Sequence, residues 1–169
     1  MILFRQEHVE PILSGRKIPL SRGLVAIVDE DDYEWLSRWR WHATCRGYAA
    51  RNKPKPERGL IFMHREILEL PEGLQGDHIN GDKIDNRRCN LRPATDAENH
   101  RNRPLRADNS SGFKGVRRRS DCNRWVAEIS VGGRYLYLGL FESAVEAARA
   151  YNAAAVLHYG EFAWLNEVS

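Results

Sequence analysis

The chain is poor in the features that mark secreted, zinc-stapled or membrane-spanning proteins. Its 169 residues include three cysteines, which are widely separated and form no Cys-x-x-Cys pair. This pattern indicates neither a disulfide framework nor a structural zinc site. No apolar run approaches the roughly 18 residues of a membrane-spanning helix, and the N-terminus lacks the apolar region of a secretory signal. We therefore expect a protein of the reducing cytoplasm with no membrane partner.

What remains is a globular composition with a mild excess of positive charge. The formal net charge is +3 and the pI is near 8.9. This excess is compatible with a polyanionic partner but does not identify one. The length allows one ordinary domain or two small ones, and the chain contains no internal repeat or low-complexity segment.

Four stretches of the chain differ in pattern. Residues 1–17 contain a helix-like run, Val9–Leu13, for which we have no functional interpretation. Residues 18–103 mix strand-like and helix-like segments. Residues 104–111 are polar, contain a proline and show no periodicity, which is typical of a linker. Residues 112–169 have a regular pattern of strands followed by a helix, so we expect a second domain there.

The mixed stretch begins with two short strand-like segments and a short helix. Ile18–Leu20 and Leu24–Val28 predict strands around a Ser-Arg-Gly turn. Acidic residues from Asp29 to Asp32 predict the start of a helix that ends near Leu36. A later apolar run, Leu60–Met63, leads into His64. Further residues expected in strands are Trp39, Trp41 and Tyr48.

The stretch after the linker predicts three strands and one helix. Apolar and polar residues alternate from Trp125 to Val131, as in a strand with one buried face. Gly132-Gly133 is a favoured two-residue hairpin turn. Ser143 with Glu146 forms a capping box that starts a helix, and Gly160 is a plausible stop. The predicted elements are strands over 115–119, 125–131 and 134–140, and a helix to about Tyr159.

The most informative segment runs from Gly76 to Asn102 and reads GDHINGDKIDNRRCNLRPATDAENHRN. The order is strand, turn-rich loop, strand and helix, with a second capping box, Thr95 to Glu98, that starts the helix. A neutral imidazole such as His78 can remove a proton from water near pH 7. Carboxylate and amide oxygens suit magnesium or manganese. These residue types are therefore suited to hydrolysis of a phosphodiester, in which a cation neutralises the phosphate.

The segment resembles the HNH homing endonucleases, which have a ββα-metal fold. It contains the Asp-His pair, the Asn-Leu-Arg after a loop with paired asparagines, and the Glu-Asn on the helix, in order and at matching spacing. The resemblance implies that Asp77 and Asn99 bind the metal, Mg²⁺ or Mn²⁺. It implies that His78 is the general base and that Asn90 orients the His78 imidazole.

Two further histidines are candidates for places near this site. An upstream His-Arg pair, here His64-Arg65, is also typical of the HNH family. For His64 a packed or hydrogen-bonded role at a strand end has equal weight. His100 follows Asn99 directly, where it would supplement the metal site or contact phosphate.

Charge is polarised along the second predicted domain. Residues 112–135 contain six basic and two acidic groups, net +4, whereas residues 136–169 contain one basic and four acidic groups, net −3. The sheet is thus predicted to be positive and the helix negative. A basic sheet fits double-stranded DNA, because lysines and arginines neutralise phosphates and release counterions. Arginines on a sheet can also reach guanine in the major groove.

From Ser111 to about Asn166 the chain resembles the AP2 DNA-binding domain. The pieces that carry the resemblance are GFKGVR from Gly112, WVAEI from Trp125, YLG from Tyr137 and AARAY from Ala147. Plant members often have arginine at the positions of Lys114, Ser130 and Tyr135, so the resemblance does not supply the DNA target. It implies a DNA face made of Lys114, Arg117, Arg119, Glu128, Ser130, Tyr135 and Tyr137.

Taken together, these patterns predict an α+β protein. It would have a ββα-metal (HNH) nuclease module over 18–103, with a preceding β-rich segment, and a three-stranded antiparallel sheet plus helix over 112–169. We expect a phage or mobile-element endonuclease that nicks DNA as a monomer. The alternative is a non-catalytic DNA-binding regulator with a relic HNH module, although a relic is expected to have lost one of the four motif residues. RNA binding is a weaker third alternative, because the sheet lacks an aromatic stacking motif of the usual kind.

Overall fold

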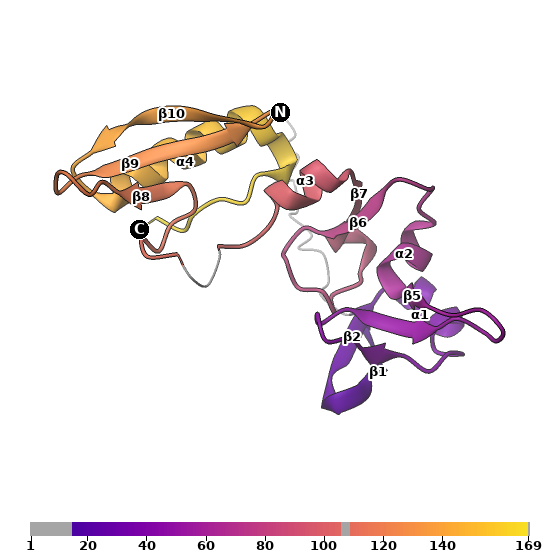
Figure 1. The fold of residues 1–169 in the computed structure, drawn as a ribbon. Helices are drawn as coiled ribbons and strands as arrows, with labels where there is room; N and C mark the ends of the chain where they lie inside the picture. Colours follow the sequence, from indigo (N-terminus) through magenta and orange to yellow (C-terminus); the bar gives the residue numbers. More distant parts are fainter. Residues whose placement is uncertain (1–14, 106–108, 169) are drawn as a thin grey trace, which may run out of the picture. The chain divides into compact units, whose positions relative to one another are not determined.

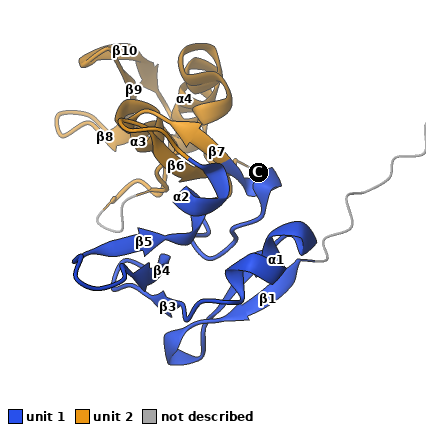
Figure 2. Cartoon of the chain, turned by 90° about the vertical axis from the view of Figure 1, so that its right-hand side faces the viewer, with its two compact units in different colours: residues 1–69, 82–91 blue, residues 70–81, 92–169 orange. Residues whose placement is uncertain are grey.

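The computed structural model describes residues 15–105 and 109–168 (Figure 1). The predicted helix-like run Val9–Leu13 and the middle of the predicted linker 104–111 lie outside the described residues. Contacts divide the chain into two units, which Figure 2 shows in blue and orange. The first unit extends up to residue 69 and includes 82–91, and the second comprises 70–81 and the residues from 92 onward. Within the described ranges, no helix is long and apolar enough to cross a membrane.

The first unit is built from short antiparallel strands and two short helices. The predicted strand pair forms, with Ile18 opposite Ala26, and the helix starts directly after Asp29 as expected. Side chains from strands and helices, among them Val28, Leu36, Met63 and Ile67, make a fully buried core. The elements are β1 (Arg16–Pro19), η1 (Ser21–Gly23), β2 (Val25–Val28), α1 (Glu30–Leu36), β3 (His42–Ala43), β4 (Ala49–Asn52), β5 (Leu60–Phe62), α2 (Met63–Leu68) and η2 (Arg88–Asn90).

The aromatic residues expected in strands lie outside them. Trp39, Trp41 and Tyr48 flank β3 and β4 instead of forming part of them. The Trp41 indole donates a hydrogen bond to the Leu36 carbonyl at 2.8 Å, so this side chain caps the C-terminal end of α1. The Trp39 ring lies under the Arg51 guanidinium, 4.2 Å from the ring centroid. Both tryptophans therefore make tertiary contacts that an apolar strand pattern does not predict.

The second unit begins with the strand that carries the Asp-His pair. β6 (Gln75–His78) pairs with β7 (Leu91–Ala94), and α3 (Asp96–Arg101) follows directly. The predicted capping box is present at the start of α3, because Thr95 accepts from the Glu98 amide and Glu98 accepts from the Thr95 amide. The remaining elements are β8 (Val116–Arg118), β9 (Trp125–Val131), β10 (Arg134–Phe141), α4 (Ala144–Tyr159) and η3 (Gly160–Phe162).

The C-terminal sheet has the order β10-β9-β8 and is covered on one face by α4. Val116, Ala127 and Ile129 are buried under this helix. The helix contributes Ala147, Ala148 and Ala155, whose small side chains allow close approach to the sheet. Ser143 and Glu146 form the predicted capping box. Gly132 and Gly133 have φ of 58° and 77°, as the predicted hairpin turn requires.

Candidate functional site

Asp77 and His78 lie at the end of β6, and both are buried. The Asp77 carboxylate is held by two side chains. Its Oδ2 accepts a hydrogen bond from Arg92 Nε at 2.8 Å, and Arg92 Nη2 lies 2.7 Å from the same oxygen. Asn102 Nδ2 lies 3.0 Å from each carboxylate oxygen and also donates to the His78 carbonyl at 2.9 Å. These contacts fix both the carboxylate and the backbone of the Asp-His pair.

The two residues that hold Asp77 are absent from the set of site residues predicted from the sequence. Arg92 is the arginine of the Asn-Leu-Arg motif and stands on β7, next to β6 in the same sheet. Asn102 is the C-cap residue of α3, one helical turn after Asn99. That spacing of three places Asn102 on the same side of the helix as Asn99, but it does not indicate a contact with Asp77. Both side chains are buried.

Asn99 is oriented by the same strand. Its Nδ2 donates to Gln75 Oε1 at 2.6 Å, and Gln75 in turn donates to Asp96 at 3.0 Å. Gln75 and Asp77 both belong to β6, so the structure brings Asp77, His78 and Asn99 to the same strand and helix pair. His100 is exposed, and its Nδ1 lies 3.1 Å from Asp96 Oδ2. Its expected position near the metal site stays a prediction.

Asn90 and His64 belong to the first unit. Asn90 is buried in η2, and its Nδ2 donates to the Asp85 carbonyl at 2.8 Å. The turn that carries it is anchored to α1, because Arg88 donates both to Asp29 through its amide and to Asp32 through its guanidinium. These contacts brace the loop on which Asn90 stands.

His64 is a packed histidine at the start of α2. It is buried, and its ring lies beside the rings of Tyr48 and Phe62, with centroids 5.4 Å and 5.7 Å away. Its ring is thus packed among aromatic side chains, and a place of His64 near the nuclease site stays a prediction. Among the described residues, no group of three or more His, Cys, Asp or Glu side chains is arranged to hold a metal ion.

Several of the residues expected to contact DNA lie on the outer face of the C-terminal sheet. Pairing puts Glu128 opposite Tyr137 and Ser130 opposite Tyr135, so these four side chains share the face away from α4. Tyr135 and Tyr137 are 76% and 65% exposed, which leaves two aromatic side chains open to a partner. Arg117 on β8 lies 3.3 Å from Glu128 in an exposed ion pair. Arg119 just beyond β8 pairs with Asp121 at 2.6 Å.

Two family models match separate parts of this chain. The HNH endonuclease model matches residues 69–101, which span β6, the loop, β7 and α3. The AP2 domain model matches residues 111–157, which span the C-terminal sheet and most of α4. An uncharacterized HNH endonuclease of Acanthamoeba polyphaga mimivirus is 30% identical over 153 residues, covering 87% of this chain and 77% of the viral protein. The chain belongs to the HNH endonuclease family.

The AP2 domain of this HNH endonuclease has plant relatives. APETALA2-like protein 2 of Oryza sativa subsp. indica is 47% identical over 62 residues. Dehydration-responsive element-binding protein 2C of Arabidopsis thaliana is 50% identical over 56 residues. These matches cover 36% and 32% of this chain but only 14% and 16% of the plant proteins. The likeness is therefore confined to the DNA-binding domain, and the chain is an HNH and AP2 fusion.

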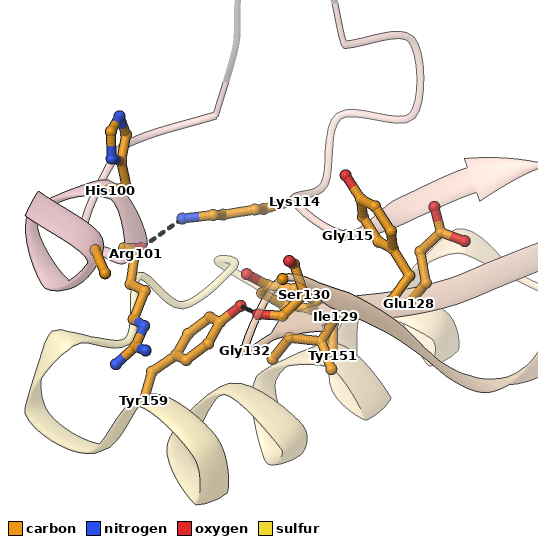
Figure 3. Close-up of a pocket in the computed structure, with 13 residues that line it drawn as sticks. His100, Arg101, Lys114, Gly115, Glu128, Ile129, Ser130, Gly132, Tyr151 and Tyr159 are labelled. Carbon is orange, nitrogen blue, oxygen red and sulfur yellow. Dashed lines mark hydrogen bonds between the residues drawn. The ribbon is translucent and has the colours of Figure 1, made fainter.

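Lys114 at the start of this AP2 domain contacts the HNH helix. Its Nζ donates hydrogen bonds to the carbonyls of Arg101 and Arg103, at 2.6 Å and 2.8 Å, and so caps the C-terminal end of α3. Figure 3 shows the bond to Arg101. It lines a cavity of about 580 Å³ together with Arg101 and Tyr159. Burial lowers the pKa of the Lys114 ammonium to about 8. The observed contact of Lys114 is thus with α3, and its expected contact with DNA stays a prediction.

We expect the partly buried ammonium of Lys114 to make the stability of this protein depend on pH. The pKa of Lys114 is lowered from 10.5 to about 8 on folding, so between these values the unfolded chain binds more protons and the free energy of unfolding rises with pH. Lys114→Met, which keeps the aliphatic stem, should lack this rise. The free energy of unfolding is measured with urea for both proteins. Between about pH 7.5 and about pH 9.5, its value for the wild type should rise by about 1 kcal/mol relative to its value for the variant.

Groups that both proteins share, such as the tyrosines, titrate equally in both and therefore do not affect this difference. The expected change of about 1 kcal/mol, only about a third of what the full pKa shift would give, reflects the water that still screens part of the ammonium. A difference between the two proteins that stays constant over this range would contradict the lowered pKa of Lys114.

Proposed function

We propose that this protein is a metal-dependent DNA endonuclease that hydrolyses phosphodiester bonds and nicks duplex DNA. The observation that carries the proposal is the buried Asp77-His78 pair at the end of β6, which lies in the part of the chain that matches the HNH model and is braced by Arg92 and Asn102. Polar and charged side chains are costly to bury. A nuclease site is a physical reason for such side chains to be held in one fixed arrangement.

In this proposal His78 is the general base. A neutral imidazole removes the proton from the attacking water, which is the step that a group with a pKa near 7 performs best. In the same proposal Asn90 orients the imidazole and braces the loop. The buried Asn90 amide donates to the Asp85 carbonyl at 2.8 Å, which supports the second of these roles. One active site per chain cuts one strand, so a monomer produces nicks.

Asp77 and Asn99 would hold the divalent cation, Mg²⁺ or Mn²⁺. The donor set fits, because a carboxylate and an amide oxygen are hard ligands that leave most positions to water and phosphate. Gln75 accepts from Asn99 Nδ2, so the amide oxygen of Asn99 is the atom left for a cation. When bound, the cation would neutralise charge on the scissile phosphate and the leaving oxygen.

The AP2 domain, residues 112–169, would hold the nuclease module, residues 18–103, on double-stranded DNA. The exposed sheet face with Arg117, Arg119, Tyr135 and Tyr137 suits this role, because its cations can neutralise phosphates and its aromatic side chains are accessible. Binding through one domain raises the effective concentration of the other at the same DNA. A small nuclease with weak affinity of its own would thereby gain a stable position.

Incubation with supercoiled plasmid tests the proposal. The full-length protein should convert supercoils to open circles with magnesium or manganese and should leave them intact with EDTA, since the phosphate charge is then not neutralised. A linear product as the first product would contradict nicking by a monomer. Cleavage that continues in EDTA would contradict metal dependence.

The same assay separates the proposal from the regulator alternative. Intact supercoils under all metal conditions, together with a gel shift of the same DNA, would favour a DNA-binding regulator. A library of random duplexes should be tested in parallel, because a nuclease with a narrow target leaves an unrelated plasmid uncut. Absence of cleavage in the library would overturn the nuclease proposal.

A further inference from the structure

The segment that follows the AP2 match reaches the site that contains Asp77. The model match ends at residue 157, and the chain continues through the end of α4 into η3 and the residues after it. Arg92 Nη1 donates to the Glu161 carbonyl at 2.6 Å. The Arg92 guanidinium also lies over the Phe162 ring, 3.9 Å from the ring centroid. One arginine thus contacts Asp77 on one side and the C-terminal segment on the other.

Further contacts attach the same segment to the HNH part of the second unit. The Arg101 guanidinium of α3 lies 5.1 Å from the centroid of the Tyr159 ring. Trp164 packs on the loop after β6, where a Cβ on Gly81 would stand 3.1 Å from the indole ring. Figure 1 shows η3, in yellow, next to α3. The segment therefore touches α3, β7 and the loop after the Asp-His pair.

The geometry leaves Arg92 little freedom. Its side chain is 9% exposed and that of Asp77 is 4% exposed, so water competes little for either charge. An arginine has five N–H donors in a planar fork, and here two of its nitrogens face Asp77 while a third donates to Glu161. Stacking on Phe162 fixes the plane of that fork. The plane of the fork in turn determines the orientation of the Asp77 carboxylate.

We propose that Arg92, held by the backbone carbonyl of residue 161 and by the Phe162 ring, is a positioning residue that orients the Asp77 carboxylate for metal binding. The C-terminal segment after the AP2 match is then part of the nuclease site as well as the end of the DNA-binding domain. This inference rests on the proposed function, in which Asp77 is a metal ligand. Partners in the shell around a ligand commonly change metal affinity by 10–100-fold when they are replaced.

Phe162→Ala tests the inference, because it removes the ring under Arg92 without touching Asp77. Mn²⁺ binding to the full-length protein, without DNA, is measured by the loss of the free-Mn²⁺ electron paramagnetic resonance signal. The Mn²⁺ binding that is lost in Asp77→Asn is assigned to the proposed metal site. Phe162→Ala should weaken this binding on the order of tenfold and should raise the Mn²⁺ concentration for half-maximal cleavage by a similar factor. Affinity for DNA in EDTA should change less than about twofold.

Glu161→Ala is the matched control. It removes an exposed carboxylate 3.7 Å from Arg92 but keeps the backbone carbonyl that Arg92 contacts, so Mn²⁺ affinity should stay within about twofold of wild type. Phe162→Tyr keeps the ring and should restore wild-type binding. If Phe162→Ala does not fold, Arg92→Lys replaces it, because lysine keeps the charge but loses the fork and should show the same tenfold loss.

The outcomes separate this inference from the proposed function. A wild-type protein that neither binds Mn²⁺ at an Asp77-dependent site nor cuts DNA would overturn the proposed function. A wild-type protein that does both, with unchanged Mn²⁺ affinity in Phe162→Ala, would overturn the role of Arg92 and Phe162 alone. If Phe162→Ala lowered DNA affinity and thermal stability together with Mn²⁺ affinity, the segment would have only a general structural role. That result would also overturn the inference.

Discussion

His78→Ala should lower the rate of DNA cleavage by about a hundredfold to ten-thousandfold while leaving DNA affinity nearly unchanged. That range is the usual contribution of a positioned acid or base to a proton transfer. His78 is the imidazole next to Asp77 at the end of β6, whereas the sheet expected to bind DNA is formed by β8, β9 and β10. Single-turnover cleavage at saturating protein gives the rate, and a gel shift in EDTA gives the affinity.

The control must separate a chemical loss from a folding loss. His78 is buried, so its truncation leaves a cavity that destabilises the protein. His78→Asn fills more of this space and cannot act as a base near pH 7, so it should be as slow as the alanine variant. His158→Ala changes an exposed histidine on α4 and should cut like wild type. Parallel loss of cleavage and DNA affinity in both His78 variants would contradict the assigned role.

The elements of this protein that could be predicted from its sequence are those set by near neighbours. The capping boxes at Thr95 and Ser143 depend on residues three positions apart, and both form. The alternation from Trp125 to Val131 and the Gly132-Gly133 turn likewise determine one hairpin. In each case the contacts that stabilise the element lie within the element or in the adjacent strand.

The contacts around Asp77 could not be predicted in the same way. Arg92 and Asn102 lie 15 and 25 positions away along the chain, and no local pattern indicates that both side chains meet one carboxylate. Lys114 illustrates the same limit, because a lysine at the start of a basic strand suggests a DNA contact. In the structure its ammonium closes the end of α3. Such contacts depend on how distant elements pack, which residue type and spacing alone do not fix.

Removing both Arg117 and Arg119 should weaken DNA binding about thirtyfold at physiological salt and lower the slope of log affinity against log salt by about 2. Each phosphate that a cation neutralises contributes about 0.9 to that slope through release of counterions. Both arginines are about half exposed, and their partners Glu128 and Asp121 are surface carboxylates. Surface ion pairs of this kind are weak, so both guanidinium groups can exchange a carboxylate for a phosphate.

The test is a salt series of gel shifts in EDTA with Arg117→Ala/Arg119→Ala and with Arg149→Ala as the matched control. Arg149 is an exposed arginine on α4, the helix that covers the other face of the same sheet. Its loss changes the net charge of the domain but removes no cation from the proposed DNA face, so the salt slope should not change. An equal change per arginine in both proteins would mean that net charge, and not the sheet face, governs binding. At saturating protein the double variant should still cut at the wild-type rate, because the AP2 face supplies affinity and Asp77 with His78 supplies the chemistry.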